Sequence, residues 1–160
     1  MIRAIFLDVD GTLISFSTHE IPASALRALA QAHERGVRLF IATGRAANDL
    51  GPLEGILYDG VVSLNGARCV ANDGRVVSLH PIPRADFERA LALSEEQGFA
   101  MGLELEEGVF VNRVTPDVER VAHMVAHPVP EQTDLRELFG RVECCQLCFY
   151  FDAETQRRVM

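Results

Sequence analysis

The 160-residue chain contains no lysine: all 15 of its basic residues are arginines, and 23 residues are aspartates or glutamates. The formal net charge of −8 argues against a nucleic-acid partner, because binding to a phosphate backbone requires a basic surface. A small phosphorylated ligand is still compatible with this charge, since a bound divalent cation reverses the local sign.

Long apolar runs are also missing. No segment approaches the roughly 20 apolar residues that span a bilayer, and the N-terminal sequence MIRAIFLDVDG turns acidic too soon for a secretory signal. We therefore expect a cytoplasmic protein without membrane contact. Its cysteines are expected to be reduced thiols, as is usual in that compartment; they are Cys69, Cys144, Cys145 and Cys148.

The first 45 residues follow a strand–helix–strand pattern. Apolar runs over 2–7 and 37–42 are typical of strands buried on both faces, and helical spacing occupies 22–35 between them. Such a unit joins two parallel strands through a right-handed crossover. Asp8 and Thr43 each follow a strand directly. We expect both at the carboxyl edge of a parallel sheet, where ligands bind in open α/β folds.

The pattern changes after residue 60. A third apolar run is followed by two short strands around Asn72-Asp73-Gly74, a strong hairpin signal. His80-Pro81-Ile82-Pro83 is a stiff, extended segment, and we place a domain boundary there, between 1–80 and 81–160. The second half mixes helices with hairpin strands, which indicates an α+β domain. We expect helices over 86–97, 115–126 and from 152, and strands over 99–105, 109–113 and 142–151.

The segment Asp8-Val9-Asp10-Gly11-Thr12 carries the chemistry. In an extended chain, residues two apart project to the same side, so two carboxylates are held together and repel one another. Mg²⁺ relieves this repulsion, because it prefers oxygen ligands and needs only one or two carboxylates. Asp8 and Asp10 are therefore the candidate metal ligands. With the metal, Asp8 is the candidate nucleophile towards phosphorus and Asp10 the candidate general acid and base.

Further residues at the same edge are candidates for holding the loop and the phosphate. Gly11 permits a tight turn and Thr12 can hold the loop by a hydrogen bond. The Thr43 hydroxyl and the Gly44 N–H are candidate phosphate donors. Asn65, which ends the third strand, is a candidate for the same role.

Simpler interpretations exist for some of these residues. The two aspartates could be an acidic cap after a buried strand, and Thr43-Gly44-Arg45 could be an ordinary strand-to-helix turn. Their joint occurrence favours a site. Arg45, expected in the first turn of a helix, either clamps the substrate or forms a structural ion pair.

These segments resemble a known family. Asp8-Val9-Asp10-Gly11-Thr12-Leu13 after an apolar strand resembles the first motif of the haloacid dehalogenase superfamily, and Ile41-Ala42-Thr43-Gly44-Arg45 resembles its second. The early second motif, followed by Ser63-Leu64-Asn65-Gly66-Ala67, is similar to the Cof-type sugar-phosphatase branch, subfamily IIB. That branch inserts an α/β cap between its second and third motifs.

The resemblance implies an α/β fold with a Rossmann-like parallel-sheet core in 1–80 and an inserted α+β cap in 81–160. It implies Mg²⁺ held by Asp8 and the Asp10 carbonyl, with Asp8 as nucleophile, Asp10 as acid and base, and Thr43 on the phosphate. The implied activity is hydrolysis of a small phosphate monoester, such as a sugar or other metabolite phosphate, through an aspartyl-phosphate.

The sequence departs from the family at its later motifs. The basic third motif and the acidic fourth motif, which completes the Mg²⁺ site, are not found in it. We therefore expect both domains to be incomplete, in a fragment of a longer protein or a premature-stop product. Two alternatives remain: a phosphosugar mutase of the same superfamily, and an inactive chain that retains partial Mg²⁺ or phosphate binding. The oligomeric state is left open.

Two other groups of residues invite a metal interpretation. On a strand over 142–151, Cys144 and Cys148 would point one way and Cys145 the other. We interpret them as structural thiols, with zinc as the alternative. His123 and His127 are four apart on an expected helix, but no third ligand is evident. We therefore interpret them as solvated histidines.

Overall fold

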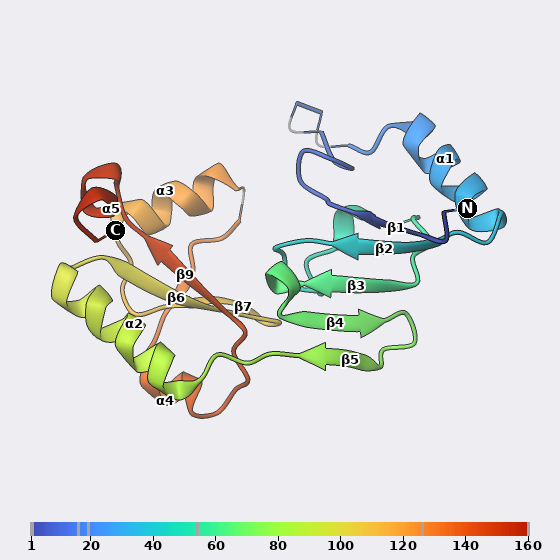
Figure 1. Ribbon diagram of the computed structural model, residues 1–160. Coiled ribbons are helices and arrows are strands. Elements are labelled where there is room, and N and C mark those ends of the chain that lie inside the picture. Colours follow the sequence, from blue (N-terminus) through green and yellow to red (C-terminus); the bar gives the residue numbers. More distant parts are fainter. Residues whose placement is uncertain (1, 16, 19, 54, 126, 160) are drawn as a thin grey trace. The chain divides into compact units, whose positions relative to one another are not determined.

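The computed structural model describes residues 2–15, 17–18, 20–53, 55–125 and 127–159. The chain divides into two compact units, Met1–His80 and Pro81–Met160 (Figure 1), and each is described by itself. Within the described residues, no helix has the length and apolar character that crossing a membrane requires.

The first unit is built on a five-stranded sheet. The first three strands in spatial order are parallel, and the last two continue the sheet as an antiparallel hairpin. Gly74, with a φ of 82°, provides the left-handed residue in the turn of this hairpin. The strands lie in the order β1 (Ala4–Leu7), β2 (Arg38–Ala42), β3 (Gly60–Ser63), β4 (Arg68–Ala71) and β5 (Val76–Leu79).

One face of this sheet carries the core of the unit. Leu7, Ile41 and Val61 lie side by side on β1, β2 and β3, in register with one another. The helix α1 (Ala23–Glu34) packs Leu29 against this group, together with apolar side chains from the segment that follows β2. The apolar runs of the sequence thus become strands because their side chains fill this core.

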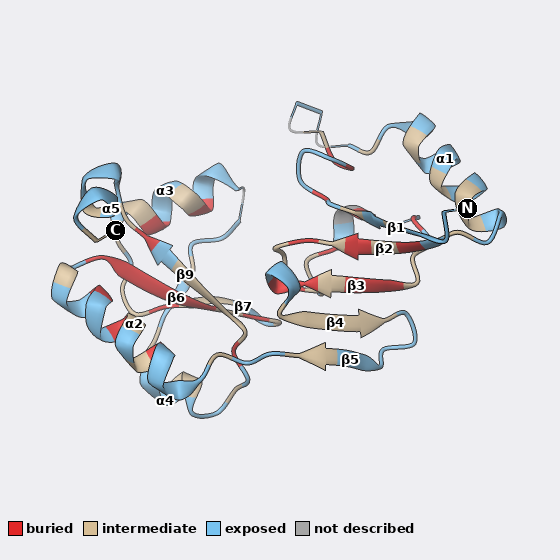
Figure 2. Cartoon of the chain, viewed as in Figure 1, coloured by how far each residue is buried: buried red, intermediate tan, exposed pale blue. Residues whose placement is uncertain are grey.

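The opposite face of the sheet is more exposed. Phe6 on β1 stacks on Phe40 of β2, with ring centroids 4.9 Å apart, yet Phe6 is 62% exposed. β1 and β5 form the two edges of the sheet. Figure 2 shows the corresponding contrast between the buried segments of β2 and β3 and the lighter colours of β1 and β5.

The second unit is an α+β fold on a four-stranded sheet. Its spatial order is β8 (Glu131–Gln132), β7 (Gly108–Val111), β6 (Ala100–Leu105) and β9 (Gln146–Tyr150). The helices α2 (Arg84–Gln97) and α4 (Leu135–Phe139) cover one face through a core that includes Phe87, Met101 and Leu135. The helix α3 (Pro116–Met124) packs Val118 against the other face, and α5 (Ala153–Val159) follows β9.

A small polar network joins α2 to the sheet of the second unit. The Asn112 side chain accepts a hydrogen bond from the Met101 N–H at 3.0 Å and donates one to Ser94 Oγ at 3.0 Å. Ser94, which is fully buried, donates in turn to the Phe99 carbonyl at 2.8 Å. Buried polar groups are therefore satisfied at the point where α2 ends and β6 begins.

Two expected elements are wrong in extent or type. The strand expected over 142–151 is only β9, because its partner β6 ends at Leu105 and the pairing stops at Glu104 with Gln146. The helix expected from Arg45 is absent: residues 43–50 form turns and irregular chain, and a single 3-10 turn, η1 (Gly51–Leu53), follows. Gly51 and Pro52 in this segment disfavour a longer helix.

The expected orientation of the cysteines is also wrong. Cys144 lies before β9 in the α2–α4 core, whereas Cys148 lies on β9 against the α3 face. They occupy opposite faces because Cys144 is not part of the strand. All four cysteines are free thiols.

Candidate active site

Three neighbouring strands end at one edge of the first sheet. Asp8 follows β1 and Thr43 follows β2, and these strands pair in parallel up to Leu7 opposite Ile41. The Thr43 N–H donates to the Val62 carbonyl of β3 at 2.9 Å. The sequence therefore brings Asp8 and Thr43, 35 residues apart, to neighbouring positions at the carboxyl edge.

The loop after β1 is closed by its own hydrogen bonds. The Gly11 N–H donates to the Ile14 carbonyl at 2.8 Å, and Gly11 adopts a φ of 79°, which favours glycine. Leu13 and Ile14 are buried and anchor the loop to the core. The Thr12 hydroxyl donates to Asp8 Oδ2 at 2.8 Å, so it orients the exposed Asp8 carboxylate. The sequence indicated a hydrogen bond from Thr12 within the loop but not this acceptor.

Asp10 is bound by Arg45. Arg45 Nε donates to Asp10 Oδ2 at 2.9 Å and Nη2 donates to Oδ1 at 2.8 Å, a paired arrangement that engages both carboxylate oxygens. These hydrogen bonds and the charge of Arg45 lower the pKa of Asp10, against the opposing effect of burial. Of the two roles considered for Arg45, the structure shows the ion pair.

A second carboxylate holds Arg45 from its other side. Arg45 Nη1 donates to Asp49 Oδ2 at 3.3 Å and to the Asp49 carbonyl at 3.2 Å. Sequence reasoning missed Asp49. Its spacing of four residues from Arg45 would have indicated such a pair on the expected helix, although the chain forms the pair without a helix.

Thr43, Gly44 and Asn65 are brought together. The Asn65 N–H donates to the Thr43 carbonyl at 3.2 Å. A Cβ built on Gly44 would lie 3.1 Å from Asn65 Oδ1, so the absence of a side chain at Gly44 admits the Asn65 amide. Thr43 is 7% exposed, and its Oγ1 accepts the Arg45 N–H at 3.1 Å.

The backbone at Asn65 is strained. Leu64 and Asn65, in the 3-10 turn η2 (Leu64–Gly66), have φ values of 50° and 54°, and Gly66 follows at 95°. Positive φ costs a non-glycine residue energy, least for asparagine, and such strain concentrates at functional sites. The loop places Asn65 beside Gly44 in spite of this cost.

The described part of the chain has no group of three or more histidine, cysteine or acidic side chains that could hold a metal ion. The cysteines of the second unit and the pair His123 and His127 therefore gain no support as a zinc site. At the sheet edge, the Asp8 carboxylate and the Asp10 backbone are oxygen donors that suit Mg²⁺. The Asp10 carboxylate is engaged by Arg45 instead.

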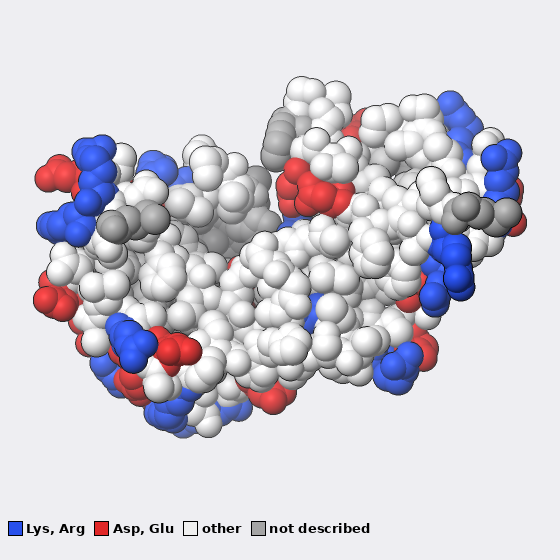
Figure 3. Space-filling model, viewed as in Figure 1, with Lys and Arg blue, Asp and Glu red and all other residues white. Residues whose placement is uncertain are grey.

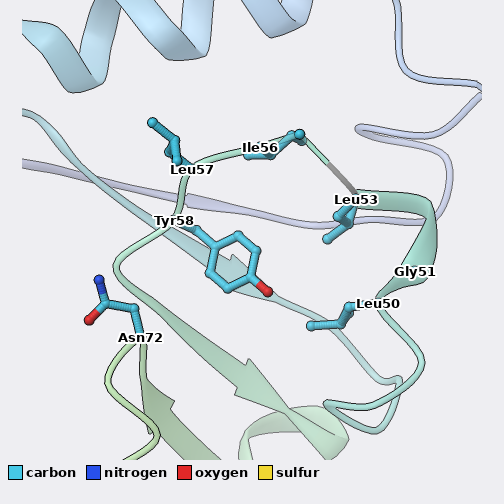
Figure 4. A pocket seen from close by; sticks show the side chains of 8 residues that line it. Leu50, Gly51, Leu53, Ile56, Leu57, Tyr58 and Asn72 are labelled. Atoms are coloured by element: carbon cyan, nitrogen blue, oxygen red, sulfur yellow. The ribbon is translucent and has the colours of Figure 1, made fainter.

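The surface of the first unit carries a group of acidic side chains and a separate hollow. Figure 3 shows a compact group of acidic side chains over the loop that follows β1. A hollow of about 480 Å³ lies elsewhere, among Leu50, Gly51, Leu53, Gly55, Ile56, Leu57, Tyr58 and Asn72 (Figure 4). The Tyr58 ring points toward Leu50 there, and the lining includes none of the predicted site residues.

Comparisons with known proteins identify the family and the fold of the chain. The sequence model of the haloacid dehalogenase-like hydrolases matches residues 5–159. The chain is 53% identical to the structure of BT1666 from Bacteroides thetaiotaomicron, studied among phosphatases of the same superfamily, with a TM-score of 0.93. It is 30% identical to the subclass IIB sugar phosphatase BT4131, with a TM-score of 0.83.

These similarities span the chain but only part of each relative. The match to BT1666 covers 100% of this chain and 60% of the BT1666 chain. The match to BT4131 covers 98% of this chain and 62% of the BT4131 chain. A curated Bacillus subtilis (strain 168) protein named "Putative phosphatase YkrA" is 30% identical over 95 residues, which are 59% of this chain and 36% of that protein. With the family match over 5–159, the chain belongs to the haloacid dehalogenase-like hydrolases.

Proposed function

We propose that this protein takes part in the Mg²⁺-dependent hydrolysis of small phosphate monoesters, with Asp8 as the nucleophile. The observation that carries the proposal is the unequal state of the two aspartates. Asp8 is exposed and oriented by the Thr12 hydroxyl, whereas both carboxylate oxygens of Asp10 are bound by Arg45. Carboxylates in different environments suit different roles in one reaction.

Each residue at the edge has a part in the proposed reaction. Thr43 and the Gly44 N–H, with Asn65 beside them, would bind the phosphate oxygens. Asp8 attacks phosphorus and forms an aspartyl-phosphate, while Asp10 gives a proton to the leaving oxygen. A water molecule then releases phosphate from Asp8, with Asp10 as its base. Mg²⁺, held by Asp8 and the Asp10 carbonyl, would neutralise charge on the transferred group.

We further propose a sugar or other metabolite phosphate as substrate, in the cytoplasm, without nucleic acid or membrane as a partner. The description of BT4131 as a sugar phosphatase supports the substrate class. The net charge of −8 supports the absence of nucleic acid. Assignment of the first unit as catalytic core and of the second as cap, which would select the substrate, is also a proposal.

The test is hydrolysis of p-nitrophenyl phosphate by the purified 160-residue chain. We expect turnover with Mg²⁺ and none after chelation, and Asp8→Asn should abolish it. Asp73→Asn is the matched control, because Asp73 is an exposed aspartate of the β4–β5 turn and should be dispensable. Turnover that survives Asp8→Asn, or an inactive wild-type chain, would refute the proposal.

A further inference from the structure

Arg45 is fixed more firmly than a surface arginine. Its N–H donates to Thr43 Oγ1 at 3.1 Å, and its carbonyl accepts the Leu64 N–H at 3.1 Å. Its guanidinium is held between Asp10 and Asp49, and its side chain is 24% exposed. The residue thus connects the loop after β1 to the ends of β2 and β3.

The two hydrogen bonds from Arg45 fix the orientation of the Asp10 carboxylate as well as balancing its charge. Two parallel N–H···O bonds to the planar guanidinium fix the plane and the rotation of the carboxylate. A lysine in the same place would supply a charge without this fixed fork. Orientation of this kind matters for a group that must deliver a proton to a defined atom.

We propose that Arg45 is the positioning residue for Asp10, and that Asp49 in turn fixes Arg45. This inference rests on the proposed function, because it takes Asp10 as the acid and base of that reaction. It assigns Arg45 to the proton-transfer group and not to the phosphate of the substrate.

The two proton transfers of the proposed reaction determine which hydrogen bonds between Arg45 and Asp10 can persist in each step. In the first step the bond from phosphorus to the substrate oxygen breaks, the bond to Asp8 forms, and the proton of the Asp10 carboxyl passes to the leaving oxygen. In the second step a water oxygen bonds to phosphorus, its proton passes to Asp10, and the Asp8 carboxylate is released. In each step the transferred proton is bound, before or after transfer, to one of the two Asp10 carboxylate oxygens, and that oxygen cannot then accept the hydrogen bond from Arg45. One bond to Arg45 therefore opens in turnover, and the other holds the carboxyl group in place.

The experiment compares two substrates of similar shape, p-nitrophenyl phosphate and phenyl phosphate, at saturating Mg²⁺. The more basic phenolate of the second depends more on protonation by an acid. Arg45→Ala removes the orientation of Asp10 but also makes Asp10 easier to protonate, because Arg45 lowers its pKa. We expect the lost orientation to dominate, so that kcat/KM for phenyl phosphate falls by roughly 100-fold, within the usual contribution of a general acid, and that for p-nitrophenyl phosphate by a much smaller factor. Arg45→Lys should fall between Arg45→Ala and wild type, and Asp49→Ala should show a weaker effect of the same kind.

Arg75→Ala is the control, because Arg75 forms an exposed ion pair with Asp73 in the β4–β5 turn. It should leave both substrates unchanged. An equal loss on both substrates in Arg45→Ala, with a raised KM, would assign Arg45 to the phosphate and overturn the inference while the proposed function stands. A wild-type chain that hydrolyses neither substrate would overturn the proposed function and the inference with it.

Discussion

Replacing Asn112 by alanine is expected to lower the free energy of unfolding of the second unit by about 1.5–4.5 kcal/mol. The Asn112 side chain accepts from the Met101 N–H and donates to Ser94 Oγ, each at 3.0 Å. Met101 is fully buried, so its N–H would lose its partner without access to water, at a cost of about 1–3 kcal/mol. Ser94 keeps its bond to the Phe99 carbonyl and loses only one partner, at about 0.5–1.5 kcal/mol.

Gln132→Ala is the matched control. The Gln132 side chain also accepts a backbone N–H, that of Val114 at 3.1 Å, but Gln132 is exposed and water replaces the lost bond. Urea unfolding followed by circular dichroism gives both free energies, and amide exchange of Met101 reports the local effect. If Asn112→Ala destabilises the chain no more than Gln132→Ala, the argument from burial is wrong.

Three further results are expected. Because Arg45 lowers the pKa of Asp10, their ion pair stabilises the fold fully at pH values above the ordinary carboxyl pKa of 3.8. This stabilisation is lost as the pH falls through the lowered pKa of Asp10. In Arg45→Gln, the free energy of unfolding measured with urea should therefore fall less steeply on the acid side. Burial raises the pKa of Cys144 to about 11 and of Cys148 to about 12, so both should resist iodoacetamide at pH 8 until unfolded, as mass spectrometry would show. Asn65→Gly removes a strained φ and should preserve stability while raising KM for p-nitrophenyl phosphate; an unchanged KM would contradict a phosphate role.

Most elements of the fold were predictable because local signals agreed with tertiary packing. The runs that became β1, β2 and β3 are mostly apolar, with Arg38 and Ser63 only at strand ends. Asn72-Asp73-Gly74 specifies the β4–β5 turn by its backbone preference. The short elements were not predicted. α4 is a single five-residue helix whose start depends on Asp134 accepting two backbone N–H groups, and β8 exists only through two residues paired with β7.

The residues of the candidate site were predictable from sequence order, but their contacts were not. Strand ends placed Asp8, Thr43 and Asn65 at one edge. The pairing of Arg45 with Asp10 depends on the path of the chain between 43 and 50, which is not the helix that the sequence suggested. The positive φ of Leu64 likewise has no signal in the sequence, whereas Asn65-Gly66 is a dipeptide that tolerates such values.

The open edges of the first sheet bear on how the protein must be handled. In the described part of the chain, β1 and β5 each pair on one side only, with Phe6 and Val77 exposed nearby. Unpaired backbone groups of this kind associate readily between molecules. At low ionic strength the net charge of −8 keeps molecules apart, and added salt screens that repulsion. Colloidal behaviour should therefore be governed by salt, and light scattering should rise with ionic strength before any unfolding occurs.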